Sequence, residues 1–196
     1  MAAGRLHEAR LFFWYMFAVF RPGAQPPAHP QKWDRDTLVS EATLRTWSSN
    51  DLDVFLVESR RLVDQQQADK RDIRSRAQVL LTTALVLGGA TVADLASHGT
   101  PLWFTTAIYA TALTCVLAAI LVAAGLLTAQ SPIGVPNMDY LESREAESLT
   151  RGAALGYSQT RGVGAGTVAV MVTALRDATL ALVIGFVIAA VAHFLP

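Results

Sequence analysis

The sequence predicts an all-α integral membrane protein: three transmembrane helices, a long cytoplasmic helix continuing into the first span, and an N-terminal interfacial helix. Three observations predict it. Of the 196 residues, 52% are hydrophobic, and the apolar runs have the lengths of membrane spans. Charge is segregated, because residues 1–76 hold 12 of the 16 Lys and Arg residues and 10 of the 16 Asp and Glu residues. Between positions 77 and 129 the only charged residue is Asp94.

The first two spans are predicted as a helical hairpin over residues 77–129. The first, 77–97, is about 31 Å long as a helix, enough to cross a bilayer core of about 30 Å. The second, 101–129, opens with Thr100-Pro101, a favourable N-cap and first helical residue. The connection between the two is so short that the helices must run antiparallel.

The third predicted span covers residues 176–196. From position 162 onward the only charged residues are Arg176 and Asp177, and the segment that precedes them is rich in Gly, Ala and Val. We interpret residues 130–175 as a cytoplasmic connection whose Gly-rich end forms an approach helix to the span. Arg176, at the start of the span, is a candidate membrane-anchoring residue.

The N-terminal segment, residues 1–32, combines an apolar stretch with a Pro-rich linker over 21–32. The apolar stretch, residues 11–20, is about 15 Å long as a helix, too short to cross a bilayer. Its aromatic content favours a helix lying in the membrane interface, with Trp14 and Tyr15 as candidate anchors. A soluble core helix and a targeting segment are the alternatives.

Residues 33–76 are predicted as a cytoplasmic helical region, in which Asn50 is the expected N-cap of a long helix. No helix breaker separates this helix from the first span. Its stripe alternates steps of three and four residues, the pattern of a coiled-coil seam. Two interpretations stay open, a seam between copies of the chain and packing against the chain itself. The stripe consists of Leu52, Leu56, Ser59, Val63, Gln66, Lys70, Ile73, Ala77 and Leu80.

Candidate sites are few. Asp94 lies near the far end of the first span, His98 follows four residues later, and His193 lies near the end of the third span. These three are a candidate polar cluster at the outer face, since intramembrane ionisable groups mark functional positions, although simple solvation is the alternative. Glycines four apart favour close helix packing, either within the chain or between copies. They are Gly152, Gly156, Gly162 and Gly166.

Several function classes are disfavoured. The net charge is zero, which gives no basic field for nucleic acid. The one cysteine, Cys115, lies in an apolar run and is interpreted as a small hydrophobic residue. The sequence shows no catalytic constellation, metal-ligand spacing or phosphate loop, so no catalytic, cofactor-binding or metal-binding residue is predicted and the protein is expected not to be an enzyme.

Short motifs resemble a family of small bacterial membrane proteins, the SLATT and Pycsar effectors of nucleotide-signalled antiphage defence. Near the first span these are Ala68-Asp69-Lys70, Arg76-Ala77 and Leu80-Leu81. Near the last span they are Tyr157, Leu175-Arg176-Asp177-Ala178 and Gly185. The resemblance covers residues 58–195 and departs from the family in its Gly-rich stretch. It implies oligomers that disrupt the membrane when signalled, and no nucleotide-binding residue is carried over.

The leading hypothesis is a non-enzymatic, oligomerising effector that perturbs the bacterial inner membrane in a defence or stress system. Lys and Arg precede the first span and occupy the long connection, which predicts a cytoplasmic N-terminus and an outside C-terminus. The expected partners are the lipid bilayer, further copies of the chain, and a cytoplasmic protein bound through residues 1–75. A membrane anchor or scaffold is the second hypothesis, and a small channel or transporter subunit the third.

Overall fold

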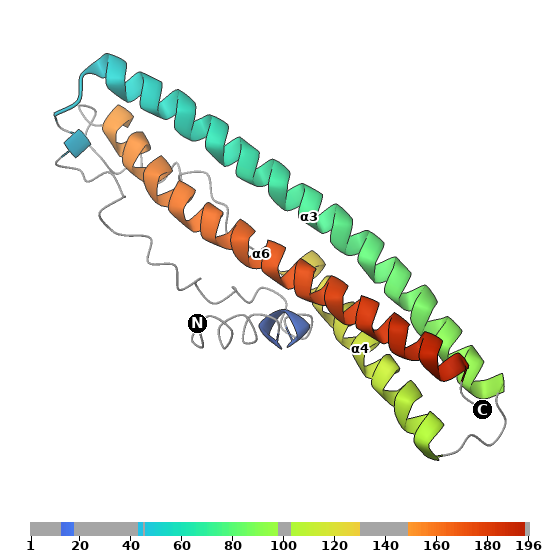
Figure 1. Cartoon of the computed structure of the whole chain (residues 1–196). Coiled ribbons are helices and arrows are strands. Elements are labelled where there is room, and N and C mark those ends of the chain that lie inside the picture. The colour runs from blue at the N-terminus through green and yellow to red at the C-terminus, as the bar shows by residue number, and fades with distance from the viewer. Residues whose placement is uncertain (1–12, 18–42, 45, 98–102, 130–148, 195–196) are drawn as a thin grey trace. The chain divides into compact units, whose positions relative to one another are not determined.

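The computed structural model describes residues 13–17, 43–44, 46–97, 103–129 and 149–194, and every regular element among them is a helix. Three helices are long (Figure 1): α3 covers Ser49–Ser97, α4 covers Trp103–Thr128 and α6 covers Leu149–His193. Short helical stretches occupy residues 13–17 and 43–44. The helical fold class predicted from the sequence is therefore confirmed for the described residues.

All three long helices contain a stretch long and apolar enough to cross a membrane. The whole of α4 qualifies, as do the apolar half of α3 and residues 164–193 of α6. At about 1.5 Å per residue, the 26 residues of α4 are about 39 Å long, more than a bilayer core of about 30 Å. These lengths and compositions agree with a multi-pass membrane protein.

The chain divides into two compact units, and two of the four boundaries between them, 71/72 and 170/171, fall inside α3 and α6. Unit 1 contains residues 1–27, 72–130 and 171–196, and therefore the apolar half of α3, all of α4 and the second half of α6. Unit 2 contains residues 28–71 and 131–170. Neither α3 nor α6 is interrupted where it passes from one unit to the other.

In unit 1 most of the buried side chains are small, although Tyr15, Tyr109, Leu126 and Met171 are fully buried as well. Ala84 of α3, Val116 and Ala119 of α4, and Leu182 of α6 form one buried cluster. Gly185 brings α6 so close to α4 that an added Cβ would lie 3.1 Å from the Ala112 carbonyl oxygen and 3.2 Å from Val116. An added Cβ at Gly88 of α3 would lie 3.3 Å from the same Val116. Val116 is thus held between two glycines, one on each neighbouring helix.

Many of the large apolar side chains of unit 1 point outward. Members from all three helices, including Val86, Leu117 and Ile184, are more than half exposed. In a water-soluble protein such side chains would fill the core. Small residues inside and large apolar residues outside are typical of helices that pack against each other within lipid.

In unit 2, α3 and α6 run parallel. Leu52 and Leu56 of α3 share a buried cluster with Leu44 and with Ala154 of α6. Further along, the Arg60 guanidinium lies 5.9 Å from the centre of the Tyr157 ring, and Gly164 lies against the Gln66 side chain. Residue numbers therefore increase in the same direction along α3 and α6. The residues in contact are separated in the chain by close to 99 positions, which is the separation of Asp94 and His193 in unit 1.

The predicted stripe of α3 is buried within the chain itself. Leu52, Leu56, Ser59, Val63, Ile73 and Ala77 are all at most 8% exposed, and Gln66, Lys70 and Leu80 are partly buried. The partners that the structure shows for this face belong to the same chain. Of the two interpretations left open by the sequence, the structure favours packing against the chain's own helices, and it provides no support for a coiled-coil seam between copies.

The start of α3 differs from the prediction, because the N-cap is Ser48 rather than Asn50. The Ser48 hydroxyl oxygen accepts the Asp51 backbone N–H at 3.2 Å, and Asp51 Oδ2 accepts the Ser48 backbone N–H at 3.2 Å. This reciprocal pair is a capping box. The Ser48 hydroxyl also donates to Asp51 at 2.6 Å, and these hydrogen bonds hold the pKa of Asp51 below its usual value. Asn50 lies one residue inside the helix.

The predicted approach helix and third span form one continuous helix. α6 begins at Leu149 and runs through the Gly-rich stretch to His193 without interruption. Arg176 therefore lies in the middle of α6 and not at a helix start. The Pro-rich linker, residues 33–42 and 45 of the predicted cytoplasmic helical region, and the Thr100-Pro101 start of the second span lie outside the described residues.

We expect Ser48→Ala to loosen the first turn of α3, because the Asp51 backbone N–H loses its acceptor. Hydrogen exchange of the amides in this turn should become about fivefold faster, the typical effect of losing a serine N-cap. Ser49→Ala is the matched control and should leave exchange unchanged. The Asp51 side of the cap is complete above the ordinary pKa of aspartate and is lost as the pH falls through the lowered pKa. Equal exchange in both variants would contradict the capping box.

We expect Gly185→Ala to destabilise unit 1, because the new methyl group meets a backbone carbonyl that cannot move aside. The free energy of unfolding in detergent micelles should fall by about 1–3 kcal/mol. Gly89→Ala is the control, since an added Cβ there has open space around it. The control should change stability by less than about 0.5 kcal/mol. Similar stability of the two variants would show that the close approach of α6 to α4 is wrong.

Candidate functional site

A polar cluster joins the three long helices that the structure describes in unit 1, at the end where α3 finishes and α4 starts, which we call the hairpin end. The Tyr109 hydroxyl of α4 donates a hydrogen bond to Asp94 Oδ2 of α3 at 2.5 Å. The Nδ1 atom of His193, the last residue of α6, lies 3.0 Å from Asp94 Oδ1. Each carboxylate oxygen of Asp94 thus has a partner on a different helix. We call Asp94, Tyr109 and His193 the clasp.

The three members of the clasp differ in their access to solvent. Tyr109 is fully buried. The Asp94 side chain is 25% exposed and that of His193 is 57% exposed. Tyr109 therefore fixes the carboxylate from inside the unit, while the histidine closes the cluster from the solvent side. A carboxylate in this position is not left without hydrogen-bond donors, which reduces the cost of placing it near the end of an apolar helix.

Local sequence explains how the clasp forms. Asp94 continues the heptad spacing of Ile73, Leu80 and Leu87, so it lies on the face of α3 that packs inward. Tyr109 belongs to the buried stripe of α4, which continues through Ala112 and Val116. Exposed aromatic residues surround this end of the unit, namely Trp103, Phe104 and Phe194. Such a belt is typical of helix ends at a membrane surface.

The sequence-based cluster is present in part. The structure brings Asp94 and His193 together, whereas His98 lies outside the described residues. Tyr109 was not predicted, because the predicted cluster was based on carboxylate and imidazole side chains only. Its signal was available, since it is the one polar aromatic residue in an otherwise small or aliphatic stripe of α4. A functional role for the clasp is still a prediction, and so is its position at the outer face.

Arg74 lies at the opposite end of unit 1, which we call the arginine end, and it bonds to the chain just after α4. Its Nη2 atom donates to the backbone carbonyl oxygen of Ala129 at 2.9 Å, immediately after α4 ends. Cations are favourable at helix C-termini, where the last carbonyls have no partner within the helix. Arg76 is paired with Asp72 at 2.9 Å, but both side chains are exposed, so this pair adds little stability.

The short helix at residues 13–17 packs against α4 near this end. Tyr15 is fully buried, with its ring 4.9 Å from the Trp14 ring in an edge-to-face arrangement. Its backbone carbonyl lies where a side chain at Gly125 would be. Burial raises the pKa of Tyr15, and the Arg74 charge partly offsets this effect. The Tyr15 side chain is therefore packed within unit 1, and its anchoring role is still a prediction.

Phe13 and Phe17 are the side chains that this short helix leaves accessible, at 54% and 58% exposure. Trp14 is partly buried beside Tyr15. The interfacial position of the segment is still a prediction. If the segment lies at the membrane surface, its two exposed phenylalanines are the rings that can contact lipid.

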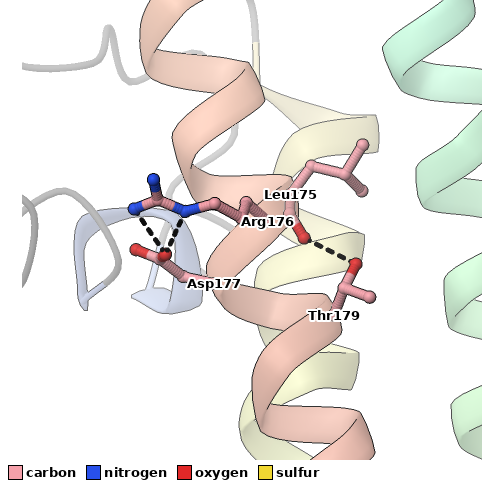
Figure 2. A network of polar contacts seen from close by, with 4 residues as sticks. All are labelled: Leu175, Arg176, Asp177 and Thr179. Atoms are coloured by element: carbon pink, nitrogen blue, oxygen red, sulfur yellow. Dashed lines mark hydrogen bonds and ion pairs between the residues drawn. The ribbon is translucent and has the colours of Figure 1, made fainter.

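Arg176 pairs with its neighbour Asp177 in the middle of α6 (Figure 2). Its Nε and Nη2 atoms lie 3.2 and 3.1 Å from the same oxygen of Asp177. The Thr179 hydroxyl donates to the Leu175 carbonyl oxygen at 2.8 Å in the same turn. The Arg176 side chain is mostly exposed, so its charged end remains available to solvent or lipid headgroups. Its anchoring role is still a prediction.

The predicted glycine stripes lie in unit 2. Gly152 is buried, and Gly156 and Gly166 are partly buried, while the surroundings of Gly162 are not described. The closest contact is made instead by Gly164, which lies between the predicted Gly162 and Gly166. A side chain at position 164 would overlap the Gln66 amide. This contact lies within the chain.

Within the described part of the chain, no group of three or more His, Cys, Asp or Glu residues is placed to hold a metal ion. No protein-family model, curated protein or solved structure matches this chain. The fold and the clasp therefore define a broad class only, a helical protein with three helices able to cross a membrane.

We expect Gly125→Leu to displace residues 13–17 from α4, because its side chain would occupy the position of the Tyr15 carbonyl. The measurement is labelling of Tyr15→Cys by a membrane-impermeant maleimide in a Cys115→Ala background. Labelling should be slow when Gly125 is present and at least several-fold faster when Gly125→Leu is added. Gly89→Leu, in open space on α3, is the control and should leave labelling slow. Fast labelling without the Gly125 substitution would contradict the packing of Tyr15.

Proposed function

We propose that this chain is a non-enzymatic protein of the bacterial inner membrane, an effector that assembles into oligomers and perturbs the bilayer. The N-terminus is cytoplasmic and the C-terminus outside. Support for this orientation comes from Arg74, Arg76 and Arg176, which all belong to the arginine end of unit 1. The hairpin end has His193 and Asp94 but no described Lys or Arg residue. Cytoplasmic ends of spans are the ends that accumulate Lys and Arg.

The observation that carries the proposal is the distribution of side-chain size in unit 1. Small residues such as Ala84, Ala112 and Gly185 fill the interior, and large apolar residues cover the outside. The contacts at Gly88 and Gly185 bring α3 and α6 close to Val116 of α4. The surface through which the protein meets its environment is therefore the lipid-facing one, and disturbance of the bilayer requires several copies.

The burial of the α3 stripe limits which faces of the chain can contact another copy. Because that face is filled by the same chain, assembly in this proposal uses the outward faces of the spans. Exposed Leu180, Ile184, Val187 and Val191 follow helical spacing along α6 and form such a face. This surface contacts lipid in a single copy and a neighbouring helix in an oligomer.

A second function, a scaffold that recruits a cytoplasmic protein, is favoured by one feature of unit 2. Val54 and Val57 lie one turn apart on the charged half of α3 and are 63% and 67% exposed. No bilayer covers this half of the helix if the charged residues around it are in water. Adjacent exposed valines on such a surface are suited to bind an apolar patch of a partner protein.

The experiment combines a potential-sensitive dye with cysteine crosslinking in intact cells. Induced expression should depolarise the inner membrane. In a Cys115→Ala background, cysteines at exposed Ile184, Leu117 or Val86 should give crosslinked dimers and larger species at one position or more. A cysteine at buried Ala178 is the matched control and should give none.

Polarised membranes at high expression, together with monomers at all three exposed positions, would rule out the effector. Crosslinks without depolarisation would show an oligomer that leaves the bilayer intact. Recovery of one soluble protein in equal amount from mild detergent, lost in Val57→Asp, would favour the scaffold.

A further inference from the structure

We propose that unit 1 thins the bilayer on one side, because lipid headgroups and water reach further into the membrane along α3 and α6 than along α4 at the hairpin end. This inference rests on the proposed function and names the way in which the protein acts on lipid. Each copy carries one thinned sector, and assembly of several copies brings such sectors together.

Three contacts place the helices of unit 1 on one scale of depth. At the hairpin end, Asp94 of α3 contacts Tyr109 of α4 and His193 of α6. At the arginine end, Arg74 of α3 bonds to the Ala129 carbonyl oxygen just after α4. The two α3 residues are 20 positions apart, and so are the two residues that they meet on α4. α4 therefore runs antiparallel to α3, and residues at equal distances from the clasp lie at the same level.

The uncharged length differs among the three helices. On α3 the stretch between Arg76 and Asp94 has 17 residues and is about 26 Å long. On α6 the stretch between Asp177 and His193 has 15 residues and is about 23 Å long. The 26 residues of α4 include no charged side chain and are about 39 Å long. Compared with a bilayer core of about 30 Å, α3 and α6 are short and α4 is long.

The extra length of α4 lies at the hairpin end. Residues 103–108 continue about 9 Å past the level of the clasp. This stretch begins with exposed Trp103 and Phe104, whose ring systems are typical of the membrane surface. On α6 the exposed aromatic residue is Phe194, directly after the clasp. The aromatic belt is therefore stepped, and it lies about 6–8 Å deeper on α6 than on α4.

Polar side chains occupy the deeper side of this step. The His193 side chain is 57% exposed and the Asp94 side chain 25% exposed. An exposed polar group below the headgroup level is accommodated by local thinning of the bilayer and by entry of water. A span that is shorter than the hydrocarbon core has the same effect. Both causes act beside α3 and α6, and neither acts beside α4.

The direction of the side chains confines the thinning to the hairpin end. Side chains on a helix tilt toward its N-terminus, which for α3 and α6 is the direction of the arginine end. The long, exposed side chains of Arg76 and Arg176 can therefore extend toward the headgroups at that end. Asp94 and His193 tilt away from the nearer surface, so the bilayer must adjust to them instead.

The closing experiment compares two positions at one depth by the accessibility of spin labels. Labels are placed singly at exposed Val191 of α6 and exposed Thr111 of α4, each two residues inside the clasp, in a Cys115→Ala background. A water-soluble nickel complex reports contact with water, and oxygen reports contact with hydrocarbon. In vesicles of phosphatidylcholine with eighteen-carbon chains, nickel accessibility should be several-fold higher at Val191 than at Thr111. Labels at exposed Leu117 and Ile184, nearer mid-depth, should both contact oxygen and not nickel.

Two variants test the cause of the difference. His193→Leu replaces the more exposed polar group with an apolar one, so nickel accessibility at Val191 should fall several-fold. Phe194→Leu is the matched control and should leave it unchanged, because the polar group stays in place. Circular dichroism checks that both variants remain helical. Equal nickel accessibility at Val191 and Thr111, or an unchanged value in His193→Leu, would overturn the proposal.

The outcomes separate this inference from the proposed function. Depolarised cells together with equal accessibility would retain the effector and reject the thinning. Unequal accessibility together with polarised cells would retain the thinning and reject the effector. Absence of oxygen contact at all four labelled positions would reject membrane insertion, and with it both proposals.

Discussion

The parallel packing of α3 against α6 is the constraint on which the rest of the structure depends. In each unit one stripe of α3 faces α6, and the contacting residues are separated by about a hundred positions in the chain. Leu56 shares a cluster with Ala154, Gln66 contacts Gly164, and Asp94 contacts His193. Side chains that recur every 3.5 residues on average keep facing one partner over many turns. This register decides that His193 reaches Asp94, because a shift of one turn would move it by about 5.4 Å.

Small residues make this packing possible in unit 1. Glycine or alanine at the contact lets two backbones approach closely, and the attraction between helices comes from many short contacts. Val116 shows the principle, since its side chain is accommodated by Gly88 on one helix and Gly185 on the other. The same arrangement leaves the larger apolar residues on the outside, where they match a lipid environment. One choice of residue size thus affects both how closely the helices approach and which apolar side chains remain exposed.

Much of the fold could be predicted from the sequence, because the strongest signals are local. The apolar runs and the spacing of Leu52, Leu56 and Val63 depend only on neighbours in the chain. The sequence could not show which helix covers that stripe, because the answer depends on pairing with residues about a hundred positions away. The cap was misplaced for a related reason: Ser48, Ser49 and Asn50 are all good N-caps, and only the hydrogen bonds of Asp51 distinguish them. Tyr15 was assigned to lipid by its residue type, but the space left by Gly125 places it inside.

The division of Asp94 between two partners has a consequence for biogenesis. Synthesis delivers α3 and α4 before α6, and these two helices already contain two of the three residues of the clasp. In the membrane protein that we propose, Tyr109 can therefore bond one carboxylate oxygen as soon as the hairpin is inserted, when an isolated acid would be most costly. The second oxygen faces the position that α6 will occupy. When the last helix arrives, His193 completes the set of hydrogen bonds, and correct insertion is marked by a carboxylate bonded through both of its oxygens.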